Sequence, residues 1–215
     1  MKQYYLETDG RVFLIKENGL YVFPTNIEEI PFSFTEKRTI KLEEQRIIYC
    51  EPELDKHPSD WVHKEDVPLR DDVGRVVRKA VNYSLPRIVV EAIIRNEKDE
   101  VLMVKPSRGY NKDGWTLPGG FLVYGESPEQ AVVREAVEEI SVEPNNLKLV
   151  DVFSAIGKQN SYQWMVFFYR AQLPESEEVK PSHEIKEIKW FQRDTAVDAI
   201  HSPVMRQGFK QAWKK

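Results

Sequence analysis

The chain has 215 residues, of which 41% are hydrophobic and 31% charged, a balance typical of a folded protein that buries its core without disulfides. Its 31 basic and 35 acidic residues give a net charge of −4, which argues against bulk nucleic acid or an anionic membrane as a partner, because both attract a surplus of positive charge. Cys50 is the one cysteine, so an intramolecular disulfide and a multi-cysteine zinc site are excluded.

Residues 1–84 are predicted to form a small β-rich N-terminal domain. Arg11 to Ile15 and Leu20 to Phe23 flank Asn18-Gly19, a dipeptide typical of hairpin turns because both residues tolerate positive φ. The next predicted elements are a strand, a polar loop and a helix: Arg46 to Cys50, Glu51 to Asp72 and Val73 to Tyr83.

From residue 85 to the end, strands and helices are interspersed, which predicts an α/β layered domain. Arg87 to Ile94 and Glu100 to Lys105 are predicted to pair as a hairpin. Ser127 is predicted to cap a helix that runs to Ile140, with Gln130 completing a capping box. A short strand up to Tyr124 precedes this helix, and three strands and two helices follow it: Leu147 to Phe153, Tyr162 to Ala171, Glu184 to Phe191, Thr195 to Ile200 and Val204 to Trp213.

Three glutamates on the predicted helix carry the strongest functional signal. Glu135, Glu138 and Glu139 stand at positions i, i+3 and i+4 and therefore share one helix face. Such a face is often simply solvated. The alternative is a hard divalent cation, because Mg²⁺ and Mn²⁺ prefer oxygen ligands and would relieve the repulsion between the carboxylates.

The spacing around these glutamates favours the cation. Gly120, Glu126, Arg134-Glu135 and Glu138-Glu139 follow the pattern G-x5-E-x7-R-E-U-x-E-E-x-G-U, where U is a bulky aliphatic residue. This segment, Gly120 to Val142, resembles the signature of the Nudix hydrolase family. The preceding segment from Trp115 to Gly120 is similar to the usual lead-in of that family, and nothing in residues 1–84 carries the resemblance.

Two positions depart from the signature. Ala136 is small where a larger aliphatic residue is usual, which affects packing more than chemistry. Ser141 replaces the final glycine, which is expected to end the helix in a left-handed conformation. A residue with a Cβ there costs about 1 kcal/mol.

The resemblance implies an α/β/α sandwich with a mixed sheet that hydrolyses a nucleoside diphosphate linked to another group, with Mg²⁺ (or Mn²⁺) as cofactor. Metals would neutralise the pyrophosphate and lower the pKa of a bound water. The catalytic residues it implies are Arg134, Glu135, Glu138 and Glu139, and the metal ligands are Gly119 through its carbonyl, Glu135, Glu138, Glu139 and Glu184. Arg134 and Glu126 are expected to orient the glutamates rather than contact substrate.

The substrate is less visible. Arg108 is a candidate for holding phosphate, and Trp115, Phe121 and Trp164 are candidates for stacking on a base, although large aromatic residues are more often core. For the loop acid near the last strand, Glu177, Glu178 and Asp194 compete with Glu184. The marks of the ADP-ribose, dinucleoside polyphosphate and zinc-ribbon subgroups are all missing. A nucleotide-binding regulator without turnover is the second function class.

Localisation and assembly are expectations of a coarser kind. The longest uncharged run, Gly114 to Gly125, is far short of the roughly 18 apolar residues of a membrane span. Met1 to Gly10 lacks the apolar core of a signal peptide, so we expect a cytoplasmic protein. The apolar N-terminal domain has a thin core, and the family resemblance favours a homodimer in which this domain contributes to the interface and the substrate pocket.

Overall fold

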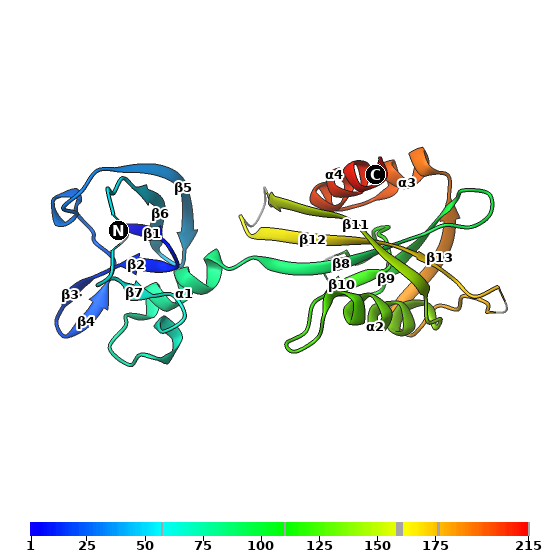
Figure 1. Ribbon diagram of the computed structural model, residues 1–215, viewed down its shortest axis with the longest axis horizontal. Coiled ribbons are helices and arrows are strands. Elements are labelled where there is room, and N and C mark those ends of the chain that lie inside the picture. The colour runs from blue at the N-terminus through cyan, green and yellow to red at the C-terminus, as the bar shows by residue number, and fades with distance from the viewer. Residues whose placement is uncertain (57, 110, 158–160, 176, 215) are drawn as a thin grey trace. The chain divides into compact units, whose positions relative to one another are not determined.

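The computed structural model describes residues 1–56, 58–109, 111–157, 161–175 and 177–214. The chain divides into two compact units, Met1–Leu85 and Pro86–Lys215 (Figure 1). Within the described ranges, no helix combines the length and apolar character needed to cross a membrane.

The first unit is built on a five-stranded sheet in the order β5-β6-β1-β2-β7. Its strands are β1 (Lys2–Thr8), β2 (Arg11–Phe13), β5 (Phe34–Leu42), β6 (Gln45–Pro52) and β7 (Val62–His63). The unit also contains the 3-10 helices η1 (Ile27–Glu29) and η2 (Val67–Leu69) and the helix α1 (Arg75–Ser84). Val77 and Val81 of α1 share a buried cluster with Tyr5 and Ile47 of the sheet, which gives this unit its own core.

The predicted Asn18-Gly19 turn is confirmed, with φ of 49° and 84° at the two residues. It joins β3 (Ile15–Glu17) to β4 (Leu20–Val22) in a separate two-stranded sheet. The single predicted strand from Arg11 is interrupted at Leu14, because β2 pairs with β1 and β7 while β3 pairs only with β4.

The second unit has a four-stranded mixed sheet in the order β10-β8-β12-β11. These strands are β8 (Arg87–Ile94), β10 (Gly119–Phe121), β11 (Asn145–Ile156) and β12 (Gln163–Gln172). The pair β8 and β12 is parallel, whereas the two outer pairs are antiparallel.

The predicted hairpin between Arg87 to Ile94 and Glu100 to Lys105 is wrong. β9 (Val101–Pro106) pairs with β13 (Ile185–Phe191) in a second sheet and touches the end of β8 only through an Arg95–Val101 bridge. The residues from 101 to 104 are all buried, on both faces of β9. A strand buried on both faces can pair in the interior, so its nearest neighbour in sequence need not be its partner.

Helices cover both faces of the four-stranded sheet, with α2 (Pro128–Ile140) on one side and α3 (Arg193–Ala199) and α4 (Pro203–Ala212) on the other (Figure 1). Alternation along β8 serves both layers. Val89 and Ile93 join the cluster of α3 and α4, whereas Val90 and Ala92 join the cluster of α2. The predicted α/β/α sandwich with a mixed sheet is confirmed.

Helix α2 begins and ends as the sequence predicts. Both hydrogen bonds of the capping box between Ser127 and Gln130 are present. Ser141 ends the helix in the left-handed conformation, with φ of 61°, and its N–H bonds the carbonyl of Val137 at 3.2 Å. The signature serine therefore occupies the position at which glycine is favoured.

Candidate active site

A cavity of about 320 Å³ lies where the glycines of β10 face helix α2. Six of the predicted site residues line it: Arg108, Gly119, Phe121, Glu135, Glu139 and Glu184. They come from the loop after β9, from β10, from α2 and from the segment before β13, which are separated in sequence by up to 76 residues. The fold thus gathers acidic side chains, one arginine and an exposed aromatic ring around one hollow.

Arg134 binds the acidic side chains on its own helix and beside it. Its guanidinium donates to Glu126 at 2.8 and 3.1 Å, to Glu135 at 2.8 Å and to Glu138 at 3.1 Å. It also donates to the carbonyl of Phe121 at 2.9 Å, which ties α2 to β10. Arg134 therefore lies where it can orient glutamates, as the sequence led us to expect for this residue and Glu126.

Glu139 is the most enclosed of the helix glutamates, at 9% exposed. Its Oε2 accepts a hydrogen bond from the Gly119 N–H at 2.9 Å. Burial, reinforced by the neighbouring carboxylates, raises the pKa of Glu139 to about 8. Burial also raises the pKa of Glu135, against the opposing effect of Arg134. These shifts show negative charge that the protein itself does not fully compensate.

The two glycines of β10 permit the close approach of strand and helix. A Cβ on Gly120 would lie 2.4 Å from Glu135 Oε1, and a Cβ on Gly119 would lie 2.1 Å from the Val90 carbonyl. Gly119 also has φ of 155°, which side chains with a Cβ rarely adopt. The Gly-Gly pair of the signature is therefore required by local geometry.

The donor set suits a hard divalent cation, since it consists of carboxylate oxygens and a glycine carbonyl beside a cavity. Within the ranges that the structure describes, no three His, Cys, Asp or Glu side chains are already grouped as a metal site. The ion pairs of Arg134 with Glu135 and Glu138 explain this arrangement, because they direct those carboxylates toward the guanidinium.

Several predicted site residues lie outside the cavity lining. The Glu138 side chain is 54% exposed and bonds Arg134. Trp164 is 6% exposed within the core cluster, and Trp115 packs edge-on against Phe191 with ring centroids 4.9 Å apart. The structure therefore corrects the placement of both tryptophans at the substrate, because burying a large aromatic ring stabilises the core. Phe121, at 52% exposed, remains available for stacking.

Arg108 and Glu184, one predicted for phosphate and the other for metal, form an ion pair with each other at the cavity. The Arg108 side chain is 69% exposed and that of Glu184 is 31% exposed. Each side chain is thus placed beside the cavity with a partner of opposite charge.

Sequence reasoning missed Glu91 and Asn111. Glu91 lies in β8 opposite Gly119, at 3% exposed. Asn111 lines the cavity and its buried Oδ1 has no hydrogen-bond partner among the described residues. A lone acid within the apolar run Ile88 to Ile94 is the signal that could have found Glu91. Asn111 lies in a polar loop and gives no such signal.

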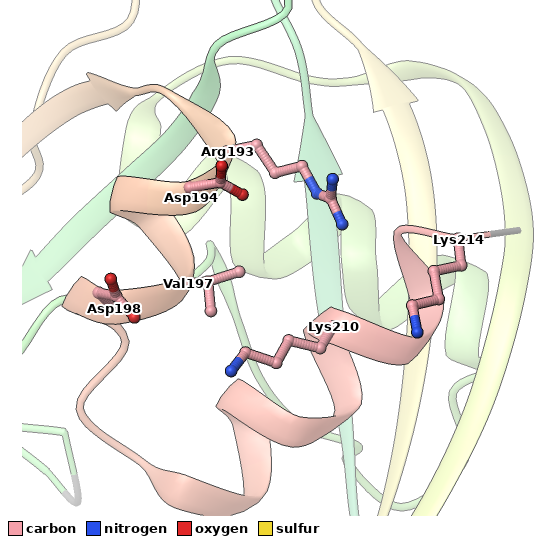
Figure 2. Close-up of a pocket in the computed structure, with 6 residues that line it drawn as sticks. All are labelled: Arg193, Asp194, Val197, Asp198, Lys210 and Lys214. Carbon is pink, nitrogen blue, oxygen red and sulfur yellow. The ribbon is translucent and has the colours of Figure 1, made fainter.

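A second hollow, of about 360 Å³, is lined by α3, α4 and the residue after α4 (Figure 2). Its charged residues are of both signs: Arg193, Lys210 and Lys214 with Asp194 and Asp198. No predicted metal ligand lines it, and the competitor acid Asp194 lies here rather than at the first cavity. The carboxylate site is therefore confined to the cavity beside β10 and α2.

Known proteins resemble the second unit. An uncharacterized Nudix hydrolase, YvcI of Bacillus subtilis, is 31% identical over 105 residues, which cover 47% of this chain and 63% of YvcI. ADP-ribose pyrophosphatase of Methanocaldococcus jannaschii is 39% identical over 82 residues, 38% of this chain and 47% of that protein. The matched region thus spans less than two thirds of either relative.

A solved structure has the same fold. The NUDIX domain of Shewanella oneidensis NrtR, in complex with ADP ribose, superposes with a TM-score of 0.53 at 20% identity and covers 70% of this chain and 96% of that one. The family model of the NUDIX domain matches residues 85–211, which include the Gly-Gly strand, the glutamate helix and the loop acid. With the signature, the sandwich and this match in agreement, the chain belongs to the Nudix family.

Proposed function

We propose that the protein is a metal-dependent pyrophosphohydrolase that cleaves a nucleoside diphosphate linked to another group. The observation that carries the proposal is the convergence of Glu135, Glu139 and Glu184 with Gly119 at one cavity within a Nudix domain. Glu135, Glu138, Glu139, Glu184 and the Gly119 carbonyl would hold Mg²⁺ or Mn²⁺. Such an ion neutralises phosphate charge and lowers the pKa of bound water.

The protein groups divide the remaining work. Glu135 is half-buried at the cavity and is placed to accept a proton from the attacking water. Arg108 is placed to bind a phosphate oxygen when Glu184 turns to the cation. Arg134 and Glu126 hold the helix face in position, and Phe121 offers an exposed ring to a base. The reaction cleaves the P–O–P bridge and gives two phosphate-containing products.

The names of relatives narrow the substrate class. One relative is called an ADP-ribose pyrophosphatase and one solved NUDIX domain holds ADP ribose. We therefore place ADP-ribose-like compounds, nucleotide sugars and dinucleotides first among the candidates.

A substrate panel tests this function. The full chain is incubated with nucleotide sugars, ADP-ribose, dinucleotides and nucleoside triphosphates in Mg²⁺ or Mn²⁺, and phosphate-containing products are separated. We expect turnover of at least one diphosphate derivative and none in the presence of a chelator. Undiminished turnover after removal of the metal would refute the mechanism.

A nucleotide-binding regulator without turnover is the second candidate. The ion pairs of Arg134 with Glu135 and Glu138 favour it, because they occupy carboxylates that a catalytic metal would need. Tight nucleotide binding with no product on the panel, in either metal, would support this function instead.

Assembly and location complete the proposal. We propose a homodimer in the cytoplasm. The buried, unpaired thiol of Cys50 suits a reducing compartment. The size of the first unit, 85 residues with several small clusters, supports stabilisation by a further contact.

A further inference from the structure

Glu91 is buried without the partners that a buried carboxylate normally has. It is 3% exposed, and its Oε2 has no hydrogen-bond partner among the described residues. The flanking residues Val90 and Ala92 are buried and apolar. Burying an uncompensated charge is costly, so a carboxylate in this position calls for a counter-charge that the folded chain alone does not supply.

The strand register places Glu91 directly beside the candidate metal site. Glu91 is the ladder partner of Gly119, whose N–H holds Glu139 at 2.9 Å. A Cβ on Gly119 would lie 2.9 Å from Glu91 Cα, and one on Gly120 would lie 2.4 Å from Glu135 Oε1. The two glycines thus contact β8 on one side and the α2 carboxylates on the other, and contribute no side chain between them.

The charges around Glu91 are of its own sign. Burial raises its pKa well above the usual range, and the nearby carboxylates of Glu139 and Glu135 raise the pKa further. The arginines at the site are engaged elsewhere. Arg134 bonds Glu126, Glu135 and Glu138, and Arg108 bonds Glu184.

We propose that Glu91 is a positioning residue of the cation site, whose buried carboxylate acts across Gly119 and on Glu139 to add negative charge that a bound divalent cation neutralises. This inference rests on the proposed metal dependence and extends it to a residue outside the signature helix. Its consequence is thermodynamic: the charge destabilises the metal-free protein and strengthens its affinity for the cation.

Titration of the full-length protein with Mn²⁺ tests this role, by calorimetry and by thermal unfolding. Glu91→Gln keeps the shape and removes the charge. We expect its dissociation constant for Mn²⁺ to rise roughly tenfold or more, as for loss of a group that supports metal ligands. Its metal-free Tm should exceed that of the wild type, and Mn²⁺ should raise its Tm less at equal concentration. Glu91→Asp, which retains the charge, should recover part of the affinity.

Asp151→Asn is the matched control, because Asp151 is 7% exposed in β11, two strands from β8 in the same sheet. It should leave the affinity for Mn²⁺ unchanged. An unchanged affinity in Glu91→Gln, or a metal-free Tm below that of the wild type, overturns the role of Glu91 while the proposed function stands. A wild-type protein that binds no Mn²⁺ overturns the metal dependence, and the role of Glu91 with it.

Discussion

Arg134 determines how the acidic face of α2 is arranged. Without a cation, like charges at helical spacing repel each other. Here the guanidinium bonds Glu126, Glu135 and Glu138, while Glu139 turns to the backbone of Gly119. The four carboxylates therefore differ in surroundings although their spacing in sequence makes them look equivalent.

Glu138→Gln tests the assignment of that carboxylate at the residue scale. The side chain is 54% exposed, so the change should leave the fold intact while removing a negatively charged ligand. We expect a rate loss on the order of 10²-fold or more, as for loss of a group that stabilises charge in the transition state. Steady-state kinetics on the substrate found in the panel measures the loss, and circular dichroism checks the fold.

Glu129→Gln provides the control, since Glu129 is an exposed glutamate in the first turn of the same helix. It should retain the rate of the wild type. Equal rates for Glu138→Gln and the wild type would remove Glu138 from the site.

At the scale of the element, α2 combines a strong start with a strained end. The capping box of Ser127 and Gln130 satisfies the first backbone donors. At the other end Ser141 holds φ of 61°, a conformation that costs a residue with a Cβ about 1 kcal/mol relative to glycine. This strain lies one turn from Glu138 and does not touch the ligands themselves.

Ser141→Gly should stabilise the protein by about 1 kcal/mol, because glycine adopts the left-handed conformation without steric cost. Thermal and urea unfolding of the full chain measure the gain. Ser141→Ala, which keeps a Cβ, should show no such gain. If Ser141→Gly were no more stable than the wild type, the strain at the helix end would be refuted.

At the scale of the whole molecule, the chain pairs a Nudix domain with a unit of a different architecture. Met1–Leu85 has its own sheet and its own buried clusters around Tyr5 and Tyr4. The family match begins at residue 85, at this same boundary. The role of the first unit is therefore separable by truncation.

A truncated protein that begins at Pro86 tests the proposed homodimer. If the first unit forms the dimer contact and shapes the substrate pocket, the truncated protein should sediment as a monomer and show a raised KM, while the full chain sediments as a dimer. A truncated protein that stays dimeric with unchanged kinetics would show that residues 1–85 have neither role.

The sequence by itself determined the features that depend on local order. Helix α2 with its cap, the left-handed Ser141, the turn at Asn18 and the signature that identifies the family all follow from residues close together in the chain. Propensity, capping and spacing act over a few residues, so they can be read without knowing the fold.

Only the tertiary structure decided the features that depend on partners distant in sequence. It paired β9 with β13 instead of β8, put Trp115 and Trp164 in the core, and placed Glu91 opposite Gly119. The physical reason is common to all three. A pattern of apolar and polar residues shows that a side chain or strand will be buried, but the neighbour that buries it is fixed by the packing of the whole domain.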